Sequence, residues 1–136
     1  MRGVMLGSFK ERLADMVKAN VYDLLELAEL LPDQTGSELA GSEHYAQDQL
    51  GAKIARRHTL RAQIPTLEAS VDTSRREAEQ AVDEGDDDLA RLVLSKQLEL
   101  DRQLSEIRTE LDGLDHSIVA LEGLLAKLKA ARQANE

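Results

Sequence analysis

A leucine-rich heptad repeat in the second half of the chain limits what the chain can fold into. From Leu100 to Leu128, apolar residues recur in steps that alternate four and three. This spacing places them in one stripe along a helix, which is typical of a coiled-coil seam. A second run with the same rhythm begins at Leu60 and ends at Ala81. The two runs predict two long helices that pack through these stripes.

The segment between the two runs carries turn and capping signals. Residues 82–88 read VDEGDDD. Gly85 suits the left-handed position that ends a helix, and Asp86 or Asp87 suits the N-cap of the next helix. The chain is therefore predicted to reverse there. The predicted fold is all-α: a long antiparallel coiled-coil helical hairpin with its tip at residues 82–88, preceded by a short N-terminal amphipathic helix. The predicted seam residues are Leu60, Ile64, Leu67, Val71, Ala78, Val93, Leu100, Leu104, Ile107, Leu111, Leu114, Ile118, Leu121 and Leu125.

The composition agrees with long helices and disfavours other classes. Of 136 residues, 71 are Ala, Glu, Lys, Leu or Arg, and aromatic residues make up only 2%. So few rings argue against a sandwich or a barrel. The absence of cysteine excludes disulfides, thiolate metal sites and Cys nucleophiles. The histidines lack metal-site spacing, and neither a nucleophile elbow nor a phosphate loop occurs. We expect no enzyme activity, no cofactor and no metal.

Three parts are expected along the chain. Residues 1–31 are predicted to form the N-terminal amphipathic helical segment, and residues 54–136 the hairpin. Residues 32–53 contain three Gly and one Pro and show little apolar periodicity, which predicts a linker or an irregular helix. Pro65 lies inside the first arm, where we expect a kink rather than a break, because the apolar residues on either side keep the register.

The first twenty residues combine an apolar stripe with basic residues. At about 100° per residue, the apolar side chains share an arc of roughly 100°, with cations at its edges. Such a helix can insert its stripe into a membrane interface while the basic side chains reach anionic headgroups. The alternative is that the stripe packs on protein, as most amphipathic helices do. The predicted membrane-binding residues are Leu6, Phe9, Lys10, Arg12, Leu13, Met16, Val17 and Lys18.

Charge and hydropathy limit the kinds of partner and the cellular location that are expected. The net charge of −9 argues against nucleic acid as a partner. Residues 21–52 contain seven acidic residues and no Lys or Arg, and the apolar, acidic stretch VYDLLELAELL at 21–31 suits protein contact. No stretch approaches the roughly 18 apolar residues that span a bilayer, and no secretory signal is recognisable. A cytoplasmic location is expected.

Two stretches of the chain carry motifs of a known family. FKERLADMVKANVYDLLELAEL at residues 9–30, with Pro32 after it, resembles the opening of the phage-shock protein A family. RREAEQAVDEGDDDLARLVLSKQLEL at residues 75–100 is similar to its hairpin tip, including a DLAR motif at residues 88–91 and a Lys-Gln pair at residues 96–97. The resemblance is to a short form that lacks the C-terminal helices of the family. This family includes the vesicle-inducing protein in plastids and is related to ESCRT-III.

The resemblance implies a function and a set of partners. It implies peripheral attachment to the inner face of the cell membrane through anionic lipids, self-association into a homo-oligomer, and a role in membrane-stress response or in membrane maintenance and remodelling. Some family members restrain an AAA+ transcription activator, so a regulatory protein is a further expected partner. The alternative function is a soluble coiled-coil adaptor or regulator that does not bind lipid.

Overall fold

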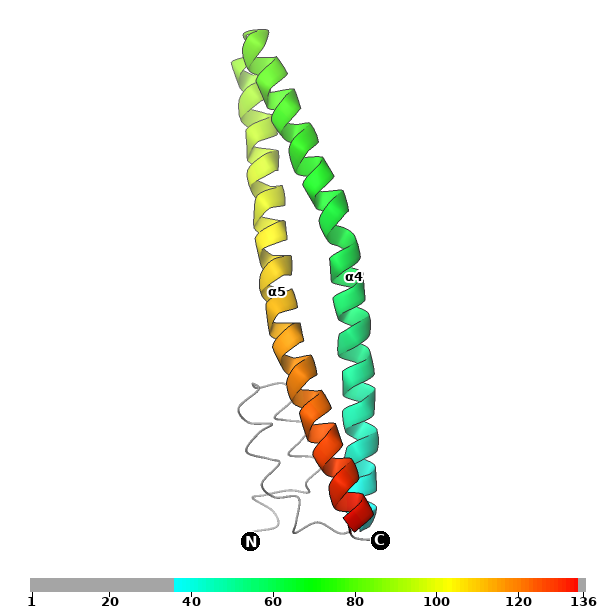
Figure 1. Ribbon diagram of the computed structural model, residues 1–136. Coiled ribbons are helices and arrows are strands. Elements are labelled where there is room, and N and C mark those ends of the chain that lie inside the picture. Colours follow the sequence, from blue (N-terminus) through cyan, green and yellow to red (C-terminus); the bar gives the residue numbers. More distant parts are fainter. Residues whose placement is uncertain (1–35, 135–136) are drawn as a thin grey trace, which may run out of the picture. The chain divides into compact units, whose positions relative to one another are not determined.

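Two α-helices make up the part of the chain that the computed structural model describes, residues 36–134. Helix α4 spans Gly36–Asp83 and helix α5 spans Asp87–Ala134, with 48 residues each. They pack against each other and are joined by a tight turn, so these residues form a helical hairpin without any strand (Figure 1). The all-helical class is confirmed to this extent. The predicted amphipathic segment 1–31, with all its membrane-binding residues, lies outside the described residues.

Helix α4 begins earlier than the apolar pattern predicts. The spacing predicts a linker or an irregular helix over residues 32–53, but residues 36–53 are regular helix continuous with the rest of α4. Leu39, Ser42 and Ala46 are buried on one side of it at steps of three and four. A helix whose inner face is small and partly polar therefore forms because packing on that face outweighs the cost of its glycines, about 1 kcal/mol each.

Pro65 does not end α4. The helix is continuous through this residue, and the proline side chain is exposed. The proline has no amide hydrogen to donate to the carbonyl of Arg61, so one hydrogen bond of the helix is lost there. Ile64 and Leu67 remain on the side of α4 that faces α5, half-buried.

The hairpin is divided into two compact units. The terminal unit contains the described residues 36–55 and 114–134, and the tip unit contains residues 56–113. The core formed by the described residues of the terminal unit contains a buried cluster against which Tyr45, Leu50 and Ala131 pack. An ion pair between Arg132 and Glu43 (Nε to Oε2, 2.6 Å) lies beside this core. The buried cluster is Leu39, Ala46, Ala120, Leu121, Leu124, Leu125 and Leu128.

Most of the predicted seam lies inside the hairpin. Ten of its residues are buried, namely Leu60, Val71, Ala78, Val93, Leu104, Leu111, Leu114, Ile118, Leu121 and Leu125. The other four, Ile64, Leu67, Leu100 and Ile107, are half-buried and all belong to the tip unit. The helices therefore pack less completely around these four residues than elsewhere.

Candidate interaction surfaces

The turn at the tip is fixed by backbone hydrogen bonds at the end of α4. Gly85 has a φ of 74°, in the left-handed region where glycine avoids the steric cost of a Cβ. The amide of Asp86 donates to the carbonyl of Ala81 at 2.8 Å, and the amide of Gly85 donates to the carbonyl of Val82 at 3.0 Å. These two bonds form a Schellman motif, which satisfies carbonyls that the helix end would leave unpaired.

The same turn caps the start of α5. The Oδ1 atom of Asp86 accepts a hydrogen bond from the amide of Leu89 at 3.1 Å, and the backbone carbonyl of Asp86 accepts one from the amide of Ala90 at 3.0 Å. Asp86 is therefore the N-cap, and Asp87 is the first helical residue of α5. The negative charges of the acidic residues at this end also interact favourably with the positive end of the helix dipole.

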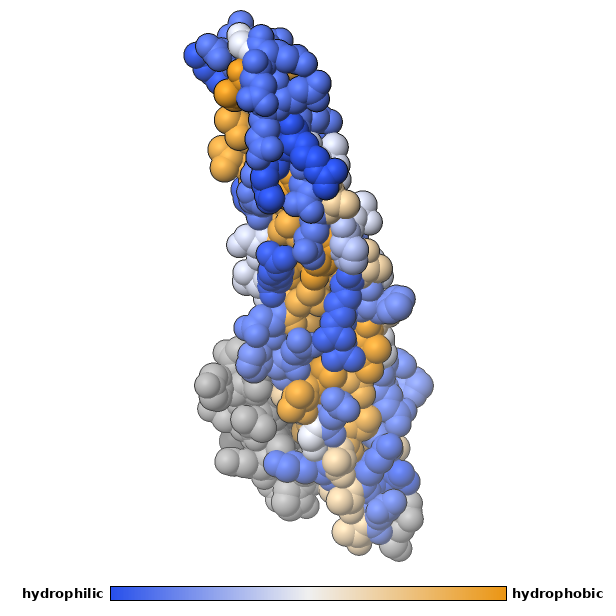
Figure 2. Space-filling model, turned by 45° about the horizontal axis from the view of Figure 1, so that its top comes forward, coloured by the Kyte–Doolittle hydropathy of each residue, from blue (hydrophilic) through white to orange (hydrophobic). Residues whose placement is uncertain are grey.

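Large apolar side chains are exposed in the tip unit. Figure 2 shows apolar surface along one edge of the hairpin just behind the hydrophilic tip. Leu92 and Leu98 are the most exposed of them, at 69% and 70%. The exposed apolar residues of this region are Val82, Leu89, Leu92, Leu94 and Leu98. Exposed apolar residues gathered in one region are typical of a protein or membrane contact.

These apolar residues lie on two sides of α5. At about 100° per residue, Leu94 and Leu98 lie on one flank of the stripe that faces α4, and Leu89 and Leu92 lie on the other. On the first flank, Leu94 lines a shallow groove of about 430 Å³ together with Ala78 and Val82 of α4. A contact surface is thus available on each side of the tip.

A larger groove lies between the two helices of the tip unit. Its volume is about 770 Å³, and its apolar lining includes Leu60, Leu67 and Ile107. Arg56 and Glu110 also line this groove and form a two-pronged ion pair, with Nε to Oε2 at 2.7 Å and Nη2 to Oε1 at 3.1 Å. The groove accompanies the incomplete burial of the seam in this unit.

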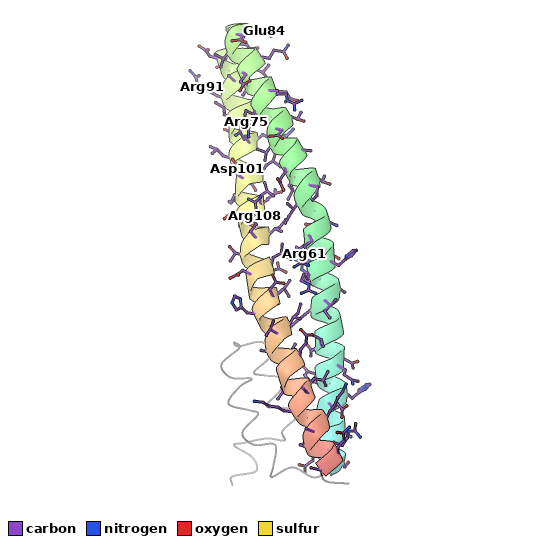
Figure 3. The ribbon with its side chains drawn as sticks, viewed as in Figure 1. Arg61, Arg75, Glu84, Arg91, Asp101 and Arg108 are labelled. Atoms are coloured by element: carbon purple, nitrogen blue, oxygen red, sulfur yellow. The ribbon has the colours of Figure 1, made fainter. Side chains whose placement is uncertain are left out.

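Ion pairs connect the two helices at their exposed edges. The hydrogen bond from Arg56 lowers the pKa of the Glu110 carboxyl, and the same bond raises the pKa of the Arg56 guanidinium. A second pair between the helices joins Arg108 to Glu68 at 3.9 Å. Charged side chains project from both helices along their length (Figure 3). These groups are exposed, so they contribute more to the choice of partner helix than to stability.

Other charged residues pair within one helix. Arg102 contacts both Glu99 and Glu106 along α5, and its hydrogen bond lowers the pKa of the Glu99 carboxyl. Arg91 pairs with Asp88 at 3.4 Å directly after the turn. Pairs three and four residues apart stabilise a helix locally. They leave the acidic tip exposed to solvent or to a partner.

Two negative findings apply to the part of the chain that the structure describes. Within residues 36–134, no group of three or more His, Asp or Glu side chains lies close enough together to hold a metal ion. In the same residues, neither helix has an apolar stretch long enough to cross a bilayer.

The fold and its surfaces define a helical hairpin with an exposed apolar tip region. The comparisons with family models, curated proteins and solved structures match nothing to this chain. The apolar tip region is the feature that the sequence pattern did not single out, although its signal was present: Leu92, Leu94 and Leu98 fall outside the heptad positions.

Proposed function

We propose that this chain is a peripheral membrane-binding, self-associating coiled-coil protein of the phage-shock protein A type. It would act in membrane-stress response or in membrane maintenance and remodelling, on the inner face of the cell membrane. The observation that carries the proposal is a hairpin with an exposed apolar tip region, in a chain whose first twenty residues have the sequence pattern of a basic amphipathic helix. The resemblance of residues 9–30 and 75–100 to that family supports the same function.

The proposal includes an antiparallel coiled coil as the structure of the hairpin. Heptad spacing on both helices and burial of residues such as Val71 and Leu104 support it. The ion pairs between Arg56 and Glu110 and between Arg108 and Glu68 flank the buried stripe, as charges do beside a coiled-coil seam.

Self-association would use the exposed apolar residues of the tip unit. Leu92 and Leu98 expose most of their surface on two different flanks of α5. Two different apolar surfaces on one chain suit head-to-tail contacts, which extend into open assemblies instead of closing as a dimer. Many weak lipid contacts would then act together, which a single short amphipathic helix needs for stable attachment.

Co-sedimentation with lipid vesicles tests both parts of the proposal. At low salt, we expect the full chain to sediment with vesicles that contain anionic lipid, and to sediment poorly with vesicles of purely zwitterionic lipid. Leu13→Glu, in the apolar stripe, should abolish this binding. Leu98→Glu, at the tip, should reduce the size of the assemblies in light scattering and weaken vesicle binding without abolishing it.

The results can contradict each part separately. Lipid binding that survives Leu13→Glu would refute the membrane role of the stripe. An assembly size unchanged by Leu98→Glu would refute the tip as a contact surface.

A second candidate is a soluble adaptor or regulator that binds another protein and no lipid. The exposed leucines at the tip favour it, because an apolar surface bordered by the acidic side chains of residues 83–88 also suits a basic partner helix. Failure to bind anionic vesicles at low salt, together with a monomeric or dimeric size in light scattering, would favour this candidate.

A further inference from the structure

Helix α5 buries a wider face in the terminal unit than in the tip unit. At about 100° per residue, the buried residues of the tip unit, Ala90, Val93, Leu104 and Leu111, fall within an arc of roughly 60°. In the terminal unit, the buried residues of α5 span roughly 160°, from Ala120 through Leu121 to Ile118. One neighbouring helix accounts for an apolar stripe of about 100°. The terminal unit therefore needs a second neighbour for α5.

The additional buried residues define a second face on α5. Leu124 is 3% exposed and Ala120 is 7% exposed, yet both lie roughly 80° to 120° around the helix from the stripe that packs on α4. Ser117 and Ala131 lie on the same side and are half-buried. We call Ser117, Ala120, Leu124 and Ala131 the second face. In the tip unit, the corresponding side of α5 carries the exposed residues Leu92, Lys96 and Glu99.

We propose that residues 21–31 of the same chain cover the second face as a short amphipathic helix. The connection to α4 has the right length, because only residues 32–35 separate this segment from Gly36 and helix-to-helix connections commonly take 2–8 residues. Eleven helical residues extend about 16 Å at 1.5 Å per residue, which matches the stretch of α5 from Ala120 to Ala131.

The side chains of the segment suit this face. Six of its apolar residues share an arc of roughly 160° when placed on a helix, and its three acidic residues, Asp23, Glu26 and Glu29, lie on the opposite side together with Leu30. The small residues of the second face allow another helix to approach closely, and Leu124 gives it one large apolar contact. The six apolar residues of this arc are Val21, Leu24, Leu25, Leu27, Ala28 and Leu31.

Charge distinguishes residues 21–31 from the other amphipathic stretch of the chain. Lys127 is exposed and borders the second face. A segment with three carboxylates and no Lys or Arg is attracted to this position. Residues 6–18 would instead bring Lys10, Arg12 and Lys18 towards it. The acidic half of the N-terminal region is therefore the segment that fits, and the basic half is left for other contacts. This inference does not rest on the proposed membrane function.

Cross-linking in the cysteine-free chain tests the proposal. A segment joined to α4 by a short connection would run in the same direction as α5, which brings Leu24 to about the level of Leu124. We expect the double variant Leu24→Cys, Leu124→Cys to form a cross-link within the monomer when treated with a short bismaleimide. The matched control is Leu24→Cys with Val119→Cys, because Val119 is 69% exposed and lies on the opposite side of α5 from Leu124.

Other outcomes would overturn the proposal. A cross-link that appears only between two chains would show that a second copy covers the face. A cross-link of Leu124→Cys to Leu13→Cys in preference to Leu24→Cys would assign the face to the basic stripe. Equal cross-linking of Leu24→Cys to Leu124→Cys and to Val119→Cys would mean that the segment has no fixed position.

Limited proteolysis gives a second readout. Chymotrypsin has candidate sites in residues 21–31, including Tyr22 and Leu24. If the segment is docked, Leu124→Asp should speed cleavage there by roughly tenfold or more, because cleavage follows the population of the undocked state. Val119→Asp should leave the rate unchanged. Circular dichroism establishes that both variants keep their helices. Equal cleavage rates in folded Leu124→Asp and Val119→Asp would overturn the proposal.

Discussion

Leu121→Ala tests the core of the terminal unit most directly. Leu121 is fully buried, with 0% of its surface exposed, and it belongs to the only large apolar cluster among the described residues of that unit. The substitution removes three carbon atoms, which corresponds to about 2.4 kcal/mol of transfer free energy at about 0.8 kcal/mol for each buried methylene. The cavity left behind adds to this loss, so we expect a total of about 3–4 kcal/mol.

Leu98→Ala is the matched control. It removes the same three carbon atoms from the same helix, but the Leu98 side chain is 70% exposed. Only about a third of the transfer free energy is then at stake, roughly 0.7 kcal/mol, and the better helix propensity of alanine offsets part of it.

Urea unfolding followed by far-ultraviolet circular dichroism measures both losses. With a slope near 2 kcal/mol per molar, Leu121→Ala should lower the midpoint by roughly 1.5–2 M, whereas Leu98→Ala should lower it by less than about 0.4 M. Equal shifts of the two midpoints would refute the claim that α5 is anchored by a buried cluster at Leu121. The measurement is made at a protein concentration where both variants have the same oligomeric state, so that association does not contribute.

Three further predictions concern the tip and the edge of the hairpin. Gly85→Ala should destabilise the protein by about 1 kcal/mol or more, because φ is positive at this residue. Gly123→Ala, at a helical position with open space around it, should instead stabilise the protein by about 0.5–1 kcal/mol. Thermal melts of the two variants measure both changes. Asp86→Ala should cost about 1 kcal/mol in urea unfolding through loss of the N-cap, and no loss would refute that role. Glu110 has a lowered pKa beside Arg56, so its stabilisation is present above pH 4.5 and lost as the pH falls through the folded-state value. Glu110→Gln should therefore lower the melting temperature slightly near pH 7 but not in strong acid, and a deficit that persists in acid would contradict this.

The tip could be predicted from the sequence because its signals are local. Gly85 is the one glycine between the two heptad runs, and Asp86 directly follows it. Each residue is favoured at its position for a local reason. Glycine tolerates positive φ, and a carboxylate accepts hydrogen bonds from the unpaired amides at the start of a helix. The structure places Gly85 at a φ of 74° and the Asp86 carboxylate on the amide of Leu89. No long-range information was needed.

The start of α4 could not be predicted from apolar residues alone. Leu39 and Ala46 are buried, but the positions between and after them on the same side of the helix are Ser42, Gln49 and Lys53. Heptad spacing is preserved there while the side chains are small or polar, so a search for large apolar residues passes over it. The burial of these positions depends on α5, where Leu121 and its neighbours supply the large side chains.

The same stretch explains why the hairpin divides into two compact units. From Ala46 the inner positions of α4 follow at Gln49, Lys53, Arg57 and Leu60, so two steps of four occur in succession. This is an insertion of four residues in the heptad rhythm, which locally unwinds a coiled coil. The division between the units falls after residue 55, at this phase shift and beside two half-buried basic residues. The inner face of α4 is therefore polar and out of phase at this boundary.

This interpretation makes the effect of Leu121→Ala local. Amide hydrogen exchange should become faster in residues 36–55 and 114–134, where the buried cluster lies, and should stay unchanged in the seam of the tip unit at positions such as Leu104. Local opening of one unit does not require the other to open if few buried contacts connect them. Leu104→Ala is the reciprocal control and should speed exchange in residues 56–113 alone. Faster exchange throughout both helices in either variant would show that the polar, phase-shifted stretch transmits unfolding as well as a regular seam does. The two units would then be one cooperative structure.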